Sequence, residues 1–403
     1  MSVRVAITGL GAISALGNDV PSHLDAILTS RTGISAPSAP TPERSGSPCA
    51  EIQNFQPEDH FVPRQLALMD RASQLAVFAA RQALTESGDV LDRASPMRNG
   101  VLFSAALGYT TIEDAYRRMY GEGSPRVHPF LVPRAMPSAP ASQICMDMKI
   151  QGPSYNIASA CASATHSIGA AFQMIRSGML DVAIAGGCEA PLTLGFMRSW
   201  DALRVVARDT CRPFSKDRNG LVMGEGAAAV VLENMDRARA RGARIHGEII
   251  GFGMSSDAVD ITAPDPDGAS RAMRAALDDA AIAADLVDYV QAHGTGTVMN
   301  DRNEAHALRA VLGDRLPGVP VSSSKAMTGH TLCASGGLSL IFTTLALREG
   351  LLPPTLNHTE NDPEFEIDCV PNVFRRASSR IAMINSFAFG GLNAVLVLKR
   401  HGE

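Results

Sequence analysis

The stretch Asn156-Ile-Ala-Ser-Ala-Cys161-Ala-Ser-Ala-Thr-His-Ser-Ile-Gly-Ala-Ala-Phe-Gln-Met-Ile-Arg-Ser-Gly178 places one cysteine among small residues. After it, Ile168, Phe172 and Ile175 recur at helical spacing, and Gly178 ends the pattern. We therefore expect Cys161 in the first turn of a mostly apolar helix. Free N–H groups and the positive end of the helix dipole favour a thiolate there. Taken alone, the stretch fits a small buried cysteine in a core helix more simply.

The composition is typical of a compact, enzyme-sized protein. A chain of 403 residues can bury a large core, in one big domain or in two ordinary ones. Hydrophobic residues make up 45% and charged residues 19%, which is within the usual range for globular proteins. The net charge is −5 and no run of Lys or Arg occurs, so nucleic acid is not an expected partner.

The seven cysteines are scattered, and none form a Cys-x-x-Cys pair. This spacing disfavours a zinc site and favours free thiols in a reducing compartment. Residues 3–7 predict a strand and not a signal peptide. A signal peptide would have a basic region and a small-residue cleavage site, and this segment has neither. No apolar run approaches the ~20 residues of a membrane helix. We therefore expect a cytoplasmic protein with no membrane insertion.

Alternating strand and helix patterns indicate an α/β fold with largely parallel sheets. Gly251-Phe-Gly-Met-Ser-Ser256 echoes Gly9-Leu-Gly-Ala-Ile-Ser14, and Cys333-Ala-Ser335 echoes Cys161-Ala-Ser163. Chance is a fair competitor for such short matches, but two echoes in the same order favour a duplicated α/β unit. We place the join near residue 245, which gives an N-terminal half, 1–245, and a C-terminal half, 246–403.

Two segments carry weaker signals. A dinucleotide-binding fingerprint would need glycine where Ser14 stands, so Gly9-Leu-Gly11 gives that function little support. Residues 108–136 contain Gly, Pro and Arg with little periodicity, and predict a long excursion that covers another part of the protein.

Three stretches in the second half place reactive residue types in loops. His293-Gly-Thr-Gly-Thr297 follows a predicted strand, and Asp301 is a candidate cap for the helix that carries Glu304. Lys325-Ala-Met-Thr-Gly-His330 forms a polar loop before an apolar helix. Phe389-Gly-Gly391 permits the tight turn of an anion-binding nest. A lone histidine is more often structural, and Lys325 with Glu304 is also compatible with an ordinary ion pair. His166 and His306, which lie on helices, are given the structural interpretation.

Together these motifs resemble those of β-ketoacyl-acyl carrier protein synthases, in particular the type II elongating kind. The motifs are Ser-Ala-Cys161-Ala-Ser, His293-Gly-Thr-Gly-Thr, Ser-Lys325-Ala-Met-Thr-Gly-His330, Phe389-Gly-Gly and Cys211-Arg-Pro-Phe-Ser-Lys-Asp-Arg-Asn-Gly. The similarity runs over residues 3–398. It implies the thiolase-like fold, with two pseudo-symmetric α/β halves in an αβαβα layered sandwich, normally as a homodimer.

The resemblance also implies a Cys-His-His site made of Cys161, His293 and His330. The cysteine would take an acyl chain as a thioester, and malonyl thioester would then lose CO2 in a Claisen condensation. N–H donors on the two histidines would stabilise the enolate, and backbone N–H groups of Cys161 and Phe389 would form an oxyanion hole. No metal and no redox cofactor is expected. The partner would be an acyl carrier protein bearing acyl or malonyl phosphopantetheine.

The resemblance assigns supporting roles to further positions. Lys325 and Glu304 would form an ion pair that fixes the His330 loop, and Phe389, with Gly390 and Gly391, would form the gate between the two substrates. Contacts to phosphopantetheine or to the acyl chain are implied for Thr262, Thr295, Thr297, Leu107 and Trp200. Docking of the acidic carrier is implied for Arg64, Arg126 and Arg204.

The chain departs from the family pattern at Leu392, Ala388 and Cys333, where threonine, glycine and glycine are usual. These departures leave the acyl chain length and the carrier open. A dedicated synthase of a specialised fatty acyl or polyketide pathway is an alternative to primary fatty acid synthesis. A non-catalytic chain-length partner subunit is another alternative, and Cys161 with both histidines argues against it. A degradative thiolase would need a second catalytic cysteine where Phe389-Gly-Gly stands.

Overall fold

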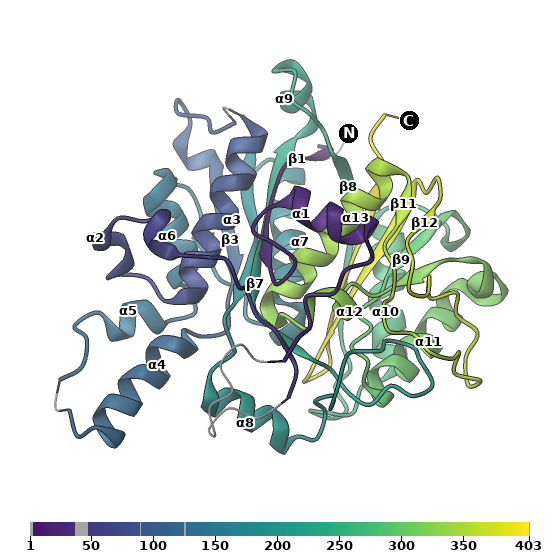
Figure 1. The fold of residues 1–403 in the computed structure, drawn as a ribbon. Coiled ribbons are helices and arrows are strands. Elements are labelled where there is room, and N and C mark those ends of the chain that lie inside the picture. The colour runs from purple at the N-terminus through teal and green to yellow at the C-terminus, as the bar shows by residue number, and fades with distance from the viewer. Residues whose placement is uncertain (1–2, 37–46, 89, 125, 403) are drawn as a thin grey trace.

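Two groups of five strands meet along one shared pairing in the computed structural model, which describes residues 3–36, 47–88, 90–124 and 126–402. In this described part the strand order is β10-β9-β13-β14-β8-β1-β7-β5-β3-β4 (Figure 1). The first five strands come from the second half of the sequence and the last five from the first half. They join where Val5–Ile7 of β1 pairs with Gly247–Ile249 of β8.

The strands of this sheet and of two small pairs are β1 (Val5–Ser14), β2 (Cys49–Ala50), β3 (Asn99–Ser104), β4 (Ser154–Tyr155), β5 (Val182–Glu189), β6 (Met223–Gly224), β7 (Gly226–Asn234), β8 (Gly247–Ser256), β9 (Tyr289–Gln291), β10 (Val321–Ser322), β11 (Leu351–Leu352), β12 (Arg375–Arg376), β13 (Ile381–Ala388) and β14 (Leu392–Lys399). The helices are α1 (Val20–Leu28), α2 (Pro63–Leu66), α3 (Arg71–Ser87), α4 (Tyr109–Tyr116), α5 (Leu131–Ala135), α6 (Ala139–Met148), α7 (Ser163–Arg176), α8 (Leu194–Ala202), α9 (Met235–Ala240), α10 (Pro266–Asp279), α11 (Val298–Leu312), α12 (Lys325–Thr328) and α13 (Ser335–Glu349).

The prediction of largely parallel sheets is wrong, because each group of strands is mixed. From the shared pairing outward, β1–β7 and β7–β5 are antiparallel, whereas β5–β3 and β3–β4 are parallel. The other group repeats this sequence of pairings through β8–β14, β14–β13, β13–β9 and β9–β10. β13 and β14 are joined by the short Phe389–Gly391 connection, which only an antiparallel pair allows. The repeated order shows that the two halves have the same architecture.

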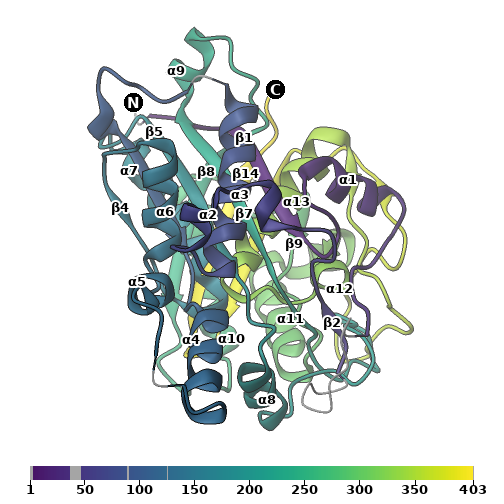
Figure 2. The same ribbon diagram turned by 60° about the vertical axis from the view of Figure 1, so that its left-hand side comes forward.

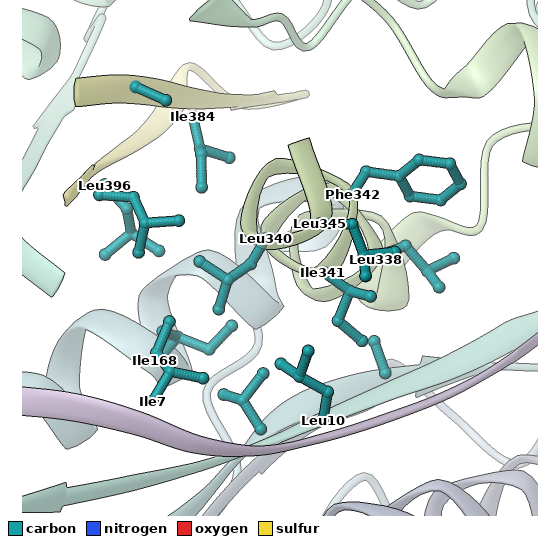
Figure 3. Packing of buried hydrophobic residues seen from close by; sticks show 14 of the residues in the cluster. Ile7, Leu10, Ile168, Leu338, Leu340, Ile341, Phe342, Leu345, Ile384 and Leu396 are labelled. Carbon is teal, nitrogen blue, oxygen red and sulfur yellow. The ribbon is translucent and has the colours of Figure 1, made fainter. Parts of the chain in front are cut away.

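Helices fill the space between the two groups of strands and also cover their outer faces (Figures 1 and 2). α7 and α13 form the inner layer, and their apolar side chains pack against β1, β7, β13 and β14. Figure 3 shows Leu340 and Ile341 of α13 among Ile7, Ile168 and Leu396. α3 and α6 cover the outer face of the first group, and α10 and α11 cover that of the second. This is the αβαβα order that the motifs imply.

The glycine echo, that is, the repeated glycines of residues 9–14 and 251–256, is explained by how closely helices pack on the two strands. A Cβ atom at Gly11 would lie 1.9 Å from the carbonyl oxygen of Ala79 in α3. In the other half, a Cβ atom at Gly253 would lie 2.3 Å from the carbonyl oxygen of Ala272 in α10. The glycines therefore let the backbone of an outer helix lie directly on a central strand, in the same way in both halves.

The excursion at residues 108–136 is more regular than expected, because it contains α4, a π-type turn at Arg117–Gly121 and α5. All seven cysteines lie in the described part, and each is a free thiol, as the sequence predicts. The helices of the described residues are each too short or too polar to span a bilayer.

Gly11→Ala should be strongly destabilising, because the new methyl group would push α3 off the sheet. Overpacking of this kind costs about 1–3 kcal/mol, and more where backbone has to move. Gly247→Ala is the matched control, because the nearest atom to its new Cβ lies 3.4 Å away. Urea unfolding of both variants measures the difference, and equal stability of the two would contradict this account of the glycine echo.

Candidate active site

Cys161 lies on a 3-10 turn, Ala160–Ala162, that runs directly into α7. Cys161 therefore lies just before the helix, whereas the prediction placed it in the first turn of the helix. Ala160 adopts the left-handed conformation with φ 47°, which turns the chain sharply just before the cysteine. The sulfur atom is buried and faces a cavity between the two halves.

The environment of the Cys161 sulfur affects its acidity in two opposite ways. Burial raises its pKa to about 11, although the nearby Lys325 charge and a backbone N–H group lower it in part. The helix start and Lys325 thus favour the thiolate, as expected, but desolvation of the sulfur works against it.

His330 approaches the cysteine from the second half of the chain. It follows α12, and its Nε2 atom lies 3.1 Å from the Cys161 sulfur. The Leu332 N–H donates to its Nδ1 atom at 3.3 Å, and the Ser335 hydroxyl lies 2.9 Å from the same atom. Because Nδ1 accepts from a backbone N–H, the proton of the neutral ring is on Nε2, which therefore points at the sulfur as a donor.

His293 follows β9, as predicted, and its ring lies 5.5 Å from that of His330, centroid to centroid. The Lys325 ammonium lies 3.4 Å from its Nδ1 atom and has only donors to offer. Nδ1 must then accept, and Nε2 of this ring carries the proton as well. Burial lowers the pKa of both histidines well below the usual value, and the Lys325 charge lowers it further. The site thus presents two neutral N–H donors beside one thiol.

Lys325 and Glu304 both hold the His293 segment, whereas the prediction had them hold the His330 loop. The Lys325 ammonium donates to the His293 carbonyl at 2.5 Å. Glu304 accepts from the N–H groups of His293 and Gly294 at 2.8 and 2.7 Å. Among the ion pairs of the described residues, none joins Lys325 to Glu304. The two charges act through the peptide between them, and burial raises the pKa of Glu304 to about 7 while it lowers that of Lys325.

A cavity of about 480 Å3 opens at these residues. Most of the predicted substrate contacts line it, namely Thr262, Thr295, Thr297 and Trp200. The predicted gate residue Phe389 and the predicted docking residue Arg204 line it as well. Leu107 does not line it. Of the predicted docking residues, Arg64 and Arg126 are exposed but also lie away from the cavity walls. The cavity therefore brings together residues from both halves of the chain.

The Phe389–Gly391 turn does not form a free anion-binding nest. The Gly390 N–H donates to the Ile261 carbonyl at 2.8 Å, and the Gly391 N–H donates to the Ala388 carbonyl at 3.0 Å. Gly390 and Gly391 have φ angles of 83° and 68°, which only glycine adopts easily. Ala388 ends β13, where it pairs with Leu392, so these two departures belong to an ordinary hairpin.

Several residues of the site carried no assigned role. Asn385 donates to the Glu304 carboxylate at 3.0 Å, and Ser335 orients His330. Asp257 accepts from Asn393 and lies against Gly391. Ser335 belongs to the Cys333-Ala-Ser335 echo, which was the available signal, whereas nothing near Asp257 in the sequence points to the site. The cap of α11 is Thr297, so the prediction for Asp301 is wrong, and Asp301 instead accepts from the Phe214 and Gly296 N–H groups.

The two histidines given the structural interpretation lie apart from this chemistry. His166 contacts the Ser159 hydroxyl and the Phe252 ring. His306 is exposed on α11, and neither histidine lines the cavity. Cys333 packs against the cysteine turn, with its sulfur 3.5 Å from the Ala160 carbonyl oxygen.

Comparison with known sequences gives matches over the whole chain. The model of the beta-ketoacyl synthase N-terminal domain matches residues 2–238, and that of the beta-ketoacyl synthase C-terminal domain matches residues 246–359. Nodulation protein E of Rhizobium sp. (strain N33) is 42% identical, over 99% of this chain and 100% of that protein. 3-Oxoacyl-[acyl-carrier-protein] synthase 2 of Staphylococcus aureus (strain MRSA252) is 40% identical, over 99% of this chain and 99% of the relative.

Solved structures agree. The ishigamide ketosynthase/chain length factor superposes with a TM-score of 0.93 at 35% identity and covers 100% of both chains. AntDE:AntF, described as a type II PKS acyl-carrier protein in complex with its ketosynthase, gives a TM-score of 0.88 at 28% identity, over 99% of this chain and 100% of that one. With this fold, these motifs and matches over both halves, the chain belongs to the β-ketoacyl synthase family of type II condensing enzymes.

Proposed function

We propose that this enzyme condenses an acyl group held on Cys161 with malonyl-acyl carrier protein, to give 3-oxoacyl-acyl carrier protein in fatty acid biosynthesis. The observation that carries the proposal is the buried thiol with two neutral N–H donors, on His293 and His330, around one cavity. A thiol and two donors suit acyl transfer followed by decarboxylation, because neither step needs a strong base.

In the first step the Cys161 sulfur attacks the thioester of an acyl carrier. The bond between the acyl carbon and the phosphopantetheine sulfur breaks, and the Cys161 proton ends on the departing phosphopantetheine thiol. Because burial raises the pKa of the thiol to about 11, deprotonation accompanies attack, and the His330 Nε2–H stabilises the negative sulfur by a hydrogen bond. The Cys161 and Phe389 N–H groups would hold the tetrahedral oxyanion.

In the second step malonyl thioester loses CO2, and the electron pair of the broken C–C bond moves into an enolate. The Nε2–H groups of His293 and His330 donate to the enolate oxygen. The enolate carbon then attacks the acyl group on Cys161 and expels the thiolate, which regains a proton. Neutral histidines suit this step, since a charged imidazolium would protonate the carbanion instead of only binding its oxygen.

Lys325 and Glu304 are proposed as positioning residues for His293. The ammonium fixes the acceptor role of Nδ1 and so keeps the proton on Nε2. The Glu304 carboxylate fixes the peptide on either side of the ring. The family's supporting pair therefore sets both the tautomer and the place of one donor.

A specialised fatty acyl or polyketide pathway is the second candidate. The similarity to nodulation protein E and to the ishigamide ketosynthase supports it, although the 3-oxoacyl-[acyl-carrier-protein] synthase 2 relatives favour the general elongating activity. A non-catalytic chain-length partner is disfavoured, because Cys161, His293 and His330 come together in one cavity.

An acyl carrier protein and a second copy of this chain are the proposed partners. Arg204, which lines the cavity, and Arg208, which lines a neighbouring pocket with Arg204, suit an acidic carrier. Arg64 and Arg126 are proposed to extend this docking surface. The edge strand β4 is exposed, and so are the side chains of Tyr120 and Val132, which suits burial against a second copy in a homodimer. The cytoplasm as the place of action follows from the proposed pathway and stays a prediction.

Cys161 should be the acylated residue. Incubation with acyl carriers of graded chain length, followed by intact mass and peptide mapping, should place the adduct on Cys161, and malonyl carrier should then release 3-oxoacyl carrier. Since its pKa is about 11, alkylation of the free enzyme by iodoacetamide should rise with pH from 7 to 10 without a plateau. An adduct on Cys333 would contradict the assignment, and a plateau near pH 7 would contradict the raised pKa.

His293→Ala and His330→Ala should each lower malonyl decarboxylation by about a hundredfold or more, because each removes an oxyanion donor worth about 2.7–4 kcal/mol. Some acyl transfer to Cys161 should survive in both variants. Release of CO2 from malonyl carrier and acylation of Cys161 are measured separately. His306→Ala, on an exposed face of α11, is the control, and an unchanged decarboxylation rate in either active-site variant would count against the mechanism.

Lys325→Ala and Glu304→Ala should each lower condensation by about a hundredfold, because a misplacement near 1 Å can cost that much. Both act through His293, so either change made in a His293→Ala background should add little. The double variant Lys325→Ala/Glu304→Ala should also lose much less than the product of the single effects. Elongation rates over the full cycle decide this, and multiplicative losses would show that the three residues do not act as a unit.

A further inference from the structure

Trp200, the only tryptophan of the chain, lies against the side chain of Phe389. The two rings are 5.8 Å apart, centroid to centroid, and their planes differ by 18°, which is a stacked arrangement. The indole is 9% exposed, whereas Phe389 is 39% exposed. Both rings line the cavity that contains Cys161, so the stack forms part of its wall.

The indole is held on a fixed support. Trp200 lies on α8, whose first N–H groups, on Leu194 and Gly195, donate to the Glu113 carboxylate of α4 at 2.8 Å each. One turn before Trp200, the Phe196 ring lies 4.2 Å from the Tyr109 ring of α4, centroid to centroid. Figures 1 and 2 both show α4 and α8 next to each other at one end of the molecule. α8 is therefore tied to its neighbour by a cap and by ring packing.

The backbone around Phe389 is less tightly packed than the helix that carries Trp200. It is followed by Gly390 and Gly391, both at positive φ, and a Cβ atom at Gly390 would meet nothing within 4 Å. Phe389 lies outside the ladder of β13, in the turn that leads to β14. Of the two stacked rings, only Phe389 is followed by two residues without side chains. The turn is held by hydrogen bonds from the Gly390 and Gly391 N–H groups, so the Phe389 ring moves when these two bonds rearrange.

We propose that Trp200 is a positioning residue that latches the Phe389 gate in its closed place. This rests on the proposed gate role of Phe389. Each opening of the gate breaks the stack against the indole, and each closing restores it. An aromatic pair shifts such an equilibrium by about two- to tenfold, so the latch sets how often the gate opens rather than whether it can open.

The simpler role, a wall of the acyl pocket, makes different predictions. A wall residue changes which acyl chains fit, but it leaves the mobility of Phe389 and the reaction of Cys161 with a small reagent unchanged. A latch changes both, and its effect depends on the Phe389 ring. The two roles are separated by the rate of a small alkylating reagent and by the emission of Trp200 itself.

The first arm measures alkylation of Cys161 by iodoacetamide at one pH, followed by intact mass. Trp200→Leu should react about two- to tenfold faster than the unchanged enzyme, and Trp200→Phe, which keeps a ring for stacking, should stay close to it. Met197→Ala on the same helix is the matched control for loosening of α8. In a Phe389→Leu background, Trp200→Leu should add nothing. An unchanged rate in Trp200→Leu, or an equal acceleration in the Phe389→Leu background, overturns the latch.

The second arm uses Trp200 as its own reporter in the unchanged enzyme, so it does not depend on a tryptophan variant that folds. Acylation of Cys161 from a short acyl carrier should change the Trp200 emission, and Phe389→Ala should abolish that change. An emission change that persists in Phe389→Ala means that the acyl chain itself touches the indole. Trp200 would then be only a wall residue of the acyl pocket, and the latch would be overturned. An enzyme that takes no acyl group at all fails the proposed function instead, and the alkylation arm still reports on the latch.

Discussion

A buried ammonium is the constraint around which the site is built. The Lys325 side chain is 3% exposed, so its charge has lost its water and must find acceptors inside the protein. It finds the carbonyl and the Nδ1 atom of His293, while Glu304 binds the adjacent N–H groups from the other side. Every one of these contacts has to be right at once, because a charge left unpaired at this depth would cost several kcal/mol. The orientation of one imidazole follows from this requirement.

The duplicated halves divide the work of the site between them. Each half has a 3-10 turn that leads into an inner helix, and the residue before the cysteine of each turn, Ala160 or Leu332, has φ 47°. One cysteine, Cys161, faces the cavity, whereas its counterpart Cys333 packs on the first turn and has a pKa raised well above the usual value by burial. Both histidines come from the second half. The duplication therefore gives two similar frameworks but only one reactive thiol.

The sequence was a good guide wherever a signal is local or repeated. Helical spacing placed α7, and the Cys161, His293 and His330 motifs placed the residues that the fold brings to one cavity. The predicted parallel direction of the strands was wrong. An apolar run indicates a strand, but it does not show whether a helix or a hairpin such as β13–β14 connects that strand to its neighbour in the sheet. The prediction that Lys325 holds the His330 loop was wrong for a similar reason. Lys325 is close to His330 in the sequence, but this closeness says nothing about its contact with His293. Leu107 was assigned as a substrate contact only from its position in the family pattern, and it does not line the cavity.

The pairing of β1 has a consequence for how the chain is made. β1 leaves the ribosome well before its neighbours on either side, which are β7, ending at Asn234, and β8, beginning at Gly247. At about 5–20 residues per second, β1 waits on the order of 10 to 50 seconds before either partner exists. Over that time an almost wholly apolar strand, VAITGLGAIS, has two open edges and no sheet to join. The edges of β1 therefore become paired only after the segment up to β7 and β8 has been translated.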